Sequence, residues 1–304
     1  MTIRLIDQEA PHHEATDSVT DDPLISDVSD TARWVAVYRA MESERPDALF
    51  RDPYARRLAG PKGEAIVDGM KGGRQMSWPM VVRTVLLDQL ILRSVADGAD
   101  TVLNLAAGLD TRAYRMALPA ALHWIDVDQA HMVAYKSDAM ANERPVCRYE
   151  SVALDLASVD ERRALFARVN AAARTTLVIT EGLLIYLRDD DVISLARDLR
   201  TCDTFHLWLT DLASPGLLKM MSKGWGKAVA AGNAPFLFGP ADGPAFFASS
   251  GWREVEYRSL FDEGLRIGRT FPLARFYRWL GTFTSQKQQE KFKHFSGVVL
   301  LERS

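Results

Sequence analysis

The strongest structural signal in this 304-residue chain is the stretch Thr101-Val102-Leu103-Asn104-Leu105-Ala106-Ala107-Gly108-Leu109-Asp110-Thr111-Arg112. Its first five residues are mainly apolar and too few for a buried helix, which predicts a buried strand. The small residues at 106–108 predict a turn whose backbone can approach a ligand closely. Asp110 and Thr111 suit the start of a helix, because their side-chain oxygens can accept from free backbone N–H groups. A strand, a tight turn and a helix in this order open a nucleotide-type site at the carboxyl end of a parallel sheet.

After residue 101, predicted strands and helices alternate along the chain. Further strands are expected at residues 122–126, 148–153, 176–180, 204–209, 252–257 and 297–301. Helices are expected at residues 129–141, 160–173 and 189–200. This alternation predicts a Rossmann-like α/β fold with a mostly parallel central sheet flanked by helices.

Two segments outside this alternation are expected to act as cap elements. Residues 29–98 are predicted to form a helical N-terminal extension, with helices over 29–41, from Asp52 to about Gly60, and over 79–95. Residues 214–243 are rich in glycine and too long for an ordinary connection, which predicts a helical insertion or substrate lid, or a purely structural arm. Residues 1–28 are acidic and poor in aromatic side chains, so a disordered tail is expected before a single domain at 29–304.

Composition and charge argue against several classes of protein. The chain has 37 basic and 40 acidic residues, a formal net charge of -3, which argues against a nucleic-acid partner. Its 2 cysteines predict no disulfide framework and a reducing compartment. No apolar run approaches the roughly 20 residues that span a bilayer, and the N-terminus lacks the pattern of a signal peptide. We therefore expect a cytoplasmic protein without a membrane partner.

Four successive loops at the carboxyl ends of the predicted strands offer glycine or an acid. Gly108 follows the first strand, and Asp126 and Asp128 end the second about twenty residues later, where a carboxylate can accept both hydroxyls of a ribose. The third strand leads into Asp155-Leu156, an acid beside an apolar residue that suits an adenine amine and its ring face. The fourth leads into Glu181. One such acid is usually a helix cap, whereas four loops in order indicate a site for an adenosine-type ligand.

The same loops argue against a dinucleotide. A pyrophosphate needs the G-x-G-x-x-G turn and bare N–H groups at a helix start. Here the first two glycine positions hold other residues, and Asp110 would repel a phosphate. S-adenosylmethionine, a cationic adenosine ligand without phosphates, matches these loops better.

The motifs at 104–112, 124–128, 155–156 and 180–187 resemble the motif series of the leucine carboxyl methyltransferase family. The chain is more closely similar to the bacterial branch of that family, whose S-adenosylmethionine-dependent methyltransferases include O-methyltransferases of polyketide biosynthesis. The stretches Thr31-Ala32-Arg33-Trp34-Val35-Ala36 and Phe50-Arg51-Asp52-Pro53-Tyr54-Ala55 also fit that branch. The resemblance is good over residues 30–182 and poor beyond 205, and it implies the class I methyltransferase fold.

The resemblance also implies roles for individual residues. Gly108 would lie under the methionine part of the cofactor, in the same turn as Ala106. Asp128, or Asp126 as the alternative, would bind the ribose. The remaining implied cofactor residues are Asp155 and Leu156 at the adenine, Glu181 at the amino group, Arg83 at the methionine carboxylate and Arg33 in a similar role.

Several of these residues also have simpler explanations. Arg83 lies in an apolar helix, where an arginine can instead snorkel or pair with an acid, and Arg112 and Arg115 fit helix packing. Tyr186 and His206 are weak catalytic candidates that also fit a core position. No metal site is predicted, since Asp211 alone follows the fifth strand. Four aromatic residues fit either a pocket or plain packing: Tyr38, Trp78, Trp225 and Phe238.

The implied reaction is transfer of a methyl group to an oxygen atom of a small molecule. A carboxylate acceptor is ionised at neutral pH and needs no general base. A phenol or alcohol would benefit from one, with His206 or Glu181 as the first candidates. The sequence shows no dedicated base, which favours a carboxylate. The alternatives are methylation of a protein C-terminal carboxylate, a nicotinamide-dependent oxidoreductase and a catalytically silent binding protein.

Overall fold

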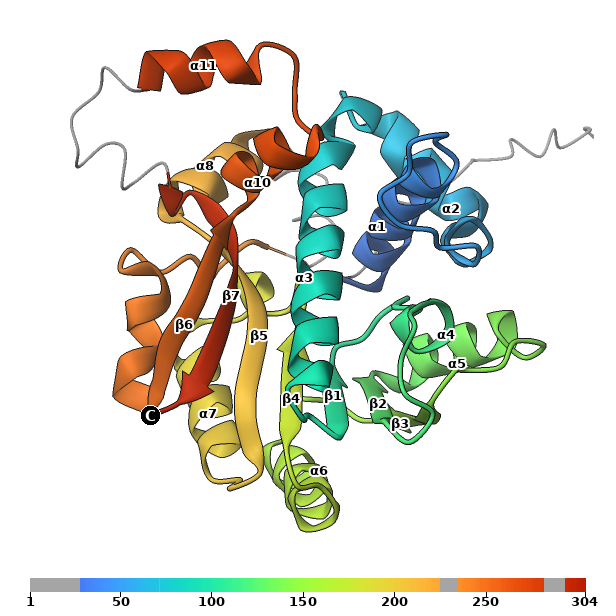
Figure 1. Ribbon diagram of the computed structural model, residues 1–304, viewed down its shortest axis with the longest axis vertical. Coiled ribbons are helices and arrows are strands. Elements are labelled where there is room, and N and C mark those ends of the chain that lie inside the picture. The colour runs from blue at the N-terminus through green and yellow to red at the C-terminus, as the bar shows by residue number, and fades with distance from the viewer. Residues whose placement is uncertain (1–27, 71, 225–234, 282–292) are drawn as a thin grey trace, which may run out of the picture.

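The computed structural model describes residues 28–70, 72–224, 235–281 and 293–304, and it places a 7-stranded sheet at the centre of the molecule (Figure 1). The strand order is β3-β2-β1-β4-β5-β7-β6. The strands are β1 (Thr101–Leu105), β2 (His123–Asp128), β3 (Arg148–Ala153), β4 (Thr176–Thr180), β5 (Phe205–Ala213), β6 (Trp252–Ser259) and β7 (Ser296–Arg303). The first five pair in parallel, and β7 runs antiparallel to β5 and β6. The predicted α/β fold with a mostly parallel sheet is confirmed.

Both faces of the sheet are buried, which explains why the central strands read as continuous apolar runs. Successive residues alternate between the faces, so Val102 packs with helix α3 (Trp78–Ala96) and Leu103 with the opposite face. Helices α6 (Val159–Ala172) and α7 (Asp189–Arg200) cover that second face. In Figure 1, α3 lies in front of the sheet and α7 behind it.

The N-terminal extension forms a third apolar cluster beside the sheet. Its helices α1 (Val28–Ser43) and α2 (Ala55–Gly69) pack near α5 (Ala130–Ala139), and the short 3-10 helix η1 (Arg74–Ser77) leads into α3. The helix predicted to end near Gly60-Pro61 does break there, and a second helical stretch continues to Gly69 within α2. Gly60 takes a φ of 61°, which kinks the chain, and Pro61 restarts the helix after the kink. The expected tail at 1–28 lies, up to residue 27, outside the described residues.

The segment after β5 is described at its two ends only. Helix α8 (Pro215–Gly224) begins the predicted insertion at 214–243, and residues 225–234 lie outside the description. Beyond it come the 3-10 helix η3 (Gly243–Ser250), α10 (Leu260–Ile267) and α11 (Ala274–Gly281). The two short elements at the sheet edge are α4 (Arg112–Arg115) and η2 (Leu184–Tyr186). No described helix is long and apolar enough to cross a bilayer.

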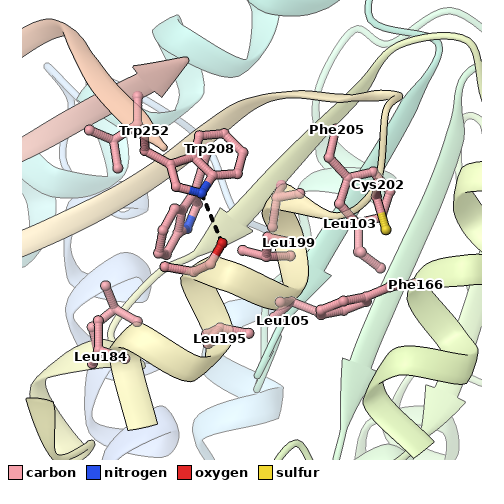
Figure 2. Close-up of a cluster of buried hydrophobic side chains, with 14 of the residues drawn as sticks. Leu103, Leu105, Phe166, Leu184, Leu195, Leu199, Cys202, Phe205, Trp208 and Trp252 are labelled. Atoms are coloured by element: carbon pink, nitrogen blue, oxygen red, sulfur yellow. Dashed lines mark hydrogen bonds between the residues drawn. The ribbon is translucent and has the colours of Figure 1, made fainter. Parts of the chain in front are cut away.

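An aromatic cluster joins β5 to the far edge of the sheet (Figure 2). The Trp208 ring lies 5.4 Å from that of Trp252 and 5.0 Å from that of Phe247, in edge-on contacts. The Trp208 indole also donates a hydrogen bond of 2.9 Å to Thr180 Oγ1 on β4. Trp208 therefore ties the parallel part of the sheet to its antiparallel edge.

We expect Trp208→Phe to lower the free energy of unfolding by about 2 kcal/mol, because the smaller ring leaves a void and removes a buried hydrogen bond. Urea unfolding followed by circular dichroism measures this change. The matched control is Trp279→Phe, whose side chain is 55% exposed and which should stay within about 0.5 kcal/mol of wild type. Equal midpoints for wild type and Trp208→Phe would contradict this role.

Candidate functional site

A cavity of about 1600 Å³ opens at the carboxyl edge of the parallel strands. The loops after β1, β2, β3 and β4 and the end of β5 all line it, as expected for a doubly wound sheet. Helices α1, α3, α8 and α10 contribute further walls. The lining from the sheet edge is rich in charged groups, whereas the lining from α8, α10 and residues 236–238 is mainly apolar.

The turn after β1 is held in an unusual backbone conformation. Ala106 and Gly108 have φ angles of 53° and 51°, in the left-handed region that an alanine rarely adopts. A side chain at Gly108 would also meet Ala32 of α1, since an added Cβ would lie 3.2 Å from the Ala32 Cβ. The turn is therefore fixed by its own backbone and by α1 above it, and both Ala106 and Gly108 line the cavity.

Asp128 sits at the rim of β2 and lines the cavity. Its carboxylate accepts hydrogen bonds from the backbone N–H groups of Gly108 at 2.6 Å and Gln129 at 2.7 Å. Burial raises the pKa of Asp128, and these two bonds oppose the rise without cancelling it. A carboxylate has about four acceptor positions, so Asp128 retains capacity for a ligand.

Asp126 is placed quite differently, although it is only two residues away. It is buried, is absent from the cavity lining and accepts from four side chains: Asn104 Nδ2 at 3.0 Å, Trp124 Nε1 at 2.7 Å, Lys136 Nζ at 2.6 Å and Tyr149 OH at 2.9 Å. Its acceptor positions are thus already used. The structure brings Asp128, and not the alternative Asp126, to the cavity.

A cluster of arginines and carboxylates forms the floor of the site. Arg112 Nη1 donates to Asp110 at 2.6 Å and to Glu181 at 2.7 Å, and its Nε donates to Asp88 at 2.7 Å. Arg115 donates to both oxygens of Asp88, at 2.7 and 2.9 Å. Arg112 is 3% exposed, so this residue is a buried bridge between three carboxylates and not only a helix-packing residue.

Arg83 links this cluster to the end of β5. Its Nη1 donates to Asp211 at 3.0 Å, and its Nε lies 3.0 Å from Glu181 Oε1. The second contact is an ion pair without hydrogen-bond geometry, so Nε is a buried donor with no hydrogen-bond partner among the described residues. Asp211 also accepts from the Gly182 N–H at 2.7 Å.

The charges in the cluster control one another's ionisation. Burial alone would raise the pKa of Glu181, but Arg112 and Arg83 hold that pKa below its ordinary value of 4.5. Burial likewise opposes ionisation of Asp110, whose pKa Arg112 and Lys136 lower. Burial would lower the pKa of Arg83, and Asp211 and Glu181 raise it instead. Glu181, Asp110 and Arg83 are therefore ionised at neutral pH.

The loop after β3 supplies the next part of the lining. Asp155 and Leu156 both line the cavity. Asp155 Oδ1 accepts from the Ala157 N–H at 3.0 Å, and the Leu156 carbonyl accepts from Arg162 at 2.8 Å. These bonds fix the loop and leave the Leu156 side chain beside the cavity, where it also packs against the core.

Like Asp126, both Arg33 and His206 lie away from the cavity lining. The Arg33 guanidinium lies 3.9 Å from the centre of the Tyr135 ring, against α5. His206 is exposed and is the second residue of β5, at the end of the strand opposite to Asp211. It is neither a core histidine nor a group at the site, because the active edge lies at the carboxyl ends of the strands.

Only some of the remaining aromatic candidates line the cavity. Tyr186 lines the cavity, burial raises its pKa, and its ring lies 5.8 Å from that of Phe236. Trp78 and Phe238 also line the cavity, whereas the Tyr38 hydroxyl donates to the Gly73 carbonyl away from it. Trp225 lies outside the described residues. The part of the chain that the structure describes holds no group of three or more His, Cys, Asp or Glu that could bind a metal ion.

Asp211 is the functional candidate that the sequence interpretation underestimated. The predicted strand ended at residue 209, but β5 continues to Ala213 and carries Asp211 to the cavity. An acid at the carboxyl end of a strand was the signal used for the other loops. The same rule identifies Asp211 once the strand is given its full length.

We expect Glu181→Gln to lower the free energy of unfolding at pH 7 by about 3 kcal/mol, because it leaves Arg83 and Arg112 buried without a shared counter-charge. The native pKa of Glu181 lies below 4.5, so its stabilisation is complete above that pH and is lost as the pH falls below it. The difference between wild type and variant should therefore narrow in acid.

Denaturant unfolding of both proteins, measured between pH 3 and 7 at intervals of about half a pH unit, gives the two free energies to compare. Glu44→Gln serves as the control, since Glu44 is 58% exposed and pairs with Arg56 on the surface. That control should follow wild type at every pH. A wild type and Glu181→Gln that differ equally at all pH values would refute the electrostatic explanation.

Comparison with known proteins assigns the chain to a family. A family model described as Leucine carboxyl methyltransferase matches residues 32–200. A Streptomyces coelicolor protein provisionally named as an S-adenosyl-L-methionine-dependent methyltransferase is 36% identical over 253 residues, which cover 79% of this chain and 87% of the relative. A Streptomyces avermitilis protein with the same kind of name is 35% identical over 254 residues, with the same two coverages.

Solved structures support the fold. The crystal structure of a DUF574 family protein from Streptomyces avermitilis has a TM-score of 0.57 at 12% identity and covers 90% of this chain and 97% of its own. That of a provisionally assigned methyltransferase from Thermobifida fusca has a TM-score of 0.55 at 12% identity, with coverages of 93% and 97%. The Rossmann-like methyltransferase fold and the cofactor predicted from the sequence are confirmed. The chain belongs to the leucine carboxyl methyltransferase family and is an S-adenosyl-L-methionine-dependent methyltransferase.

Proposed function

We propose that this protein methylates an oxygen atom, a carboxylate or a phenolic hydroxyl, of a small and largely apolar molecule. The observation that carries the proposal is the cavity itself, which joins a charged sheet edge to an apolar wall. Its volume of about 1600 Å³ exceeds the roughly 300–1,000 Å³ typical of a site for one ligand. The cavity therefore has room for a cofactor and a sizeable acceptor together.

The residues at the sheet edge fit S-adenosylmethionine. Arg83 and Glu181 present opposite charges 3.0 Å apart, the arrangement that the carboxylate and ammonium groups of an amino acid require. The buried Arg83 Nε, which lacks a hydrogen-bond partner among the described residues, is a donor available to such a carboxylate. Asp128 would accept the ribose hydroxyls with the acceptor positions that Gly108 and Gln129 leave unused.

The remaining parts of the cofactor would be held by backbone and by the β3 loop. Asp155 would accept from the adenine amine, and Leu156 would pack on the ring. The turn from Ala106 to Gly108 would pass beneath the methionine part, because Gly108 carries no side chain there. Arg33 is left out of this assignment, since it lies against Tyr135.

The opposite wall of the cavity, which we call the acceptor wall, is apolar. It consists of Met76, Trp78, Met80, Leu217, Met220, Met221, Phe236, Phe238, Leu260, Phe261, Phe271 and Phe295. Asp262, Arg278 and Lys293 are the charged residues among the cavity-lining residues of 217–295, and Arg278 pairs with Asp262. A peptide terminus would leave backbone N–H and C=O groups without partners on such a wall. The wall therefore favours a small apolar acceptor over a protein C-terminus.

The polar groups of the cavity also bear on the type of acceptor. S-adenosylmethionine supplies a methyl group that its sulfonium already activates, so the protein's task is to align the acceptor and exclude water. Glu181 is paired with two arginines, which lower its pKa and weaken it as a base, and Asp211 is engaged by Arg83. Burial raises the pKa of Tyr186, so its hydroxyl stays protonated and can donate to an acceptor oxygen. An acceptor that is already ionised, a carboxylate, fits this set best.

Titration calorimetry with S-adenosylmethionine and with NADH tests the proposed cofactor site. We expect saturable binding of S-adenosylmethionine alone, weakened about tenfold or more in Asp128→Ala through the loss of charge-assisted hydrogen bonds. Asp138→Ala is the matched control, because Asp138 is exposed on α5 and absent from the cavity lining. Unchanged affinity in Asp128→Ala would refute the ribose assignment, and absence of binding to wild type would refute the proposed cofactor site.

Transfer of a radiolabelled methyl group tests the acceptor half. The panel contains aromatic carboxylic acids, phenols and peptides with a free C-terminus, and we expect turnover of aromatic acids or phenols only. Phe236→Asp should raise the KM of the accepted compound about tenfold or more with the S-adenosylmethionine Kd unchanged, because it introduces a charge into the apolar wall. Phe236→Leu should retain near wild-type KM. Turnover confined to peptides would overturn the small-molecule assignment.

A further inference from the structure

The segment Phe50-Arg51-Asp52-Pro53-Tyr54 is absent from the main cavity lining, yet its alternate side chains contact the residues that follow the β1 turn. The Arg115 guanidinium lies 5.4 Å from the centre of the Phe50 ring. Thr111 Oγ1 donates to Asp52 Oδ2 at 2.7 Å. The rings of Tyr54 and Tyr114 meet edge-on at 6.1 Å. Three contacts in a row thus place this segment, which we call the brace, along the start of α4.

Asp52 is the polar centre of the brace. Its side chain is 0% exposed and also accepts from Arg39 Nε of α1 at 2.8 Å. Arg39 in turn donates from Nη2 to the Leu109 carbonyl at 2.6 Å. Asp52 therefore holds the turn at two points, directly at Thr111 and through Arg39 at Leu109.

The brace is also fixed to α1. The Asp52 N–H donates to Ser43 Oγ at 2.8 Å, and Arg51 donates to the Ser43 carbonyl. Helix α1 also lies directly over Gly108 through Ala32. The brace and α1 consequently both contact the turn and restrict its conformation.

The local structure of the turn shows why these contacts are needed. Ala106 is a non-glycine residue at a φ of 53°, and a strained conformation of this kind persists only where the surroundings over-determine it. Thr111 precedes α4 but makes no capping bond to the helix, and Asp110 Oδ1 accepts from the Arg112 N–H instead, at 2.7 Å. The Thr111 hydroxyl is thereby left to bind Asp52.

We propose that Asp52 is a positioning residue for the cofactor: through Thr111 and Arg39 it holds residues 106–111 in the conformation that accepts S-adenosylmethionine. This inference rests on the proposed placement of the cofactor over that turn. Without the brace, the turn samples other conformations, and the apparent affinity falls in proportion to the fraction of molecules that remain competent.

The test compares Thr111→Val, which keeps the shape of the side chain and removes its hydroxyl, with Thr111→Ser, which keeps the hydroxyl. Asp52→Asn is measured alongside them. We expect Thr111→Val and Asp52→Asn to weaken S-adenosylmethionine binding about tenfold in calorimetry, with Thr111→Ser close to wild type. Hydrogen exchange of the ligand-free protein should become faster at the amides of residues 106–110 in the two weakened variants alone.

Glu42→Gln controls for loss of any buried carboxylate on the extension, because Glu42 lies on α1 and pairs with Arg269 at 2.9 Å, away from the turn. Its thermal midpoint is expected to fall while its S-adenosylmethionine Kd and the exchange at 106–110 stay at wild-type values. If Asp52→Asn does not fold, the Thr111 pair decides.

Two results would overturn the inference in distinguishable ways. Unchanged affinity and unchanged exchange in Thr111→Val would show that the brace has only a structural role, with the cofactor site intact. Failure of the wild-type protein to bind S-adenosylmethionine would refute the cofactor site itself, and the positioning role with it.

Discussion

Burial of several carboxylates at one edge of the sheet is the constraint on which the site depends. Parallel strands end together, so Asp110, Glu181 and Asp211 are brought to a single rim, and α3 adds Asp88. Such a group is stable only with cations among its members, because isolated buried charges are costly. Three arginines supply them: Arg83, Arg112 and Arg115. With four carboxylates and three arginines, the rim stays acidic and suits a cationic ligand.

The arginines come from helices outside the sheet, so the N-terminal half of the chain supplies the cations of the cluster. Arg83 lies on α3, and the brace holds α4, which carries Arg112 and Arg115. The family match at 32–200 contains all of these parts and strands β1 to β4. Most of the acceptor wall comes from residues 217–295, beyond that match. The residues that we assign to the cofactor therefore lie mainly within the family match, and most of the acceptor wall lies outside it.

Local patterns predicted the buried strands well and the contacts between distant segments poorly. The apolar run at 176–180 predicted β4 with its observed limits, since burial on both faces leaves a clear signal. The prediction for β3 at 148–153 also has the observed limits, although that strand lies at the edge of the sheet and is only partly buried. The prediction for β5 ended at residue 209 because Thr210 and Asp211 are polar. In the structure, pairing with β7 extends the strand to Ala213. The role of Arg112 could not be foreseen, because its partners Asp88 and Glu181 lie 24 and 69 residues away.

Asp126 and Asp128 show how depth along a strand separates a structural acid from one that can bind a ligand. Both lie on β2, two residues apart, and alternation alone puts them on the same face. Asp126 pairs in register with Asn104 and Ser151 inside the sheet, where only side chains, including a buried Lys136, can satisfy its charge. Asp128 reaches the rim, where two backbone N–H groups suffice to fix it. A carboxylate held by backbone alone keeps acceptor positions for a ligand, and this is why we assign the binding role to the rim position.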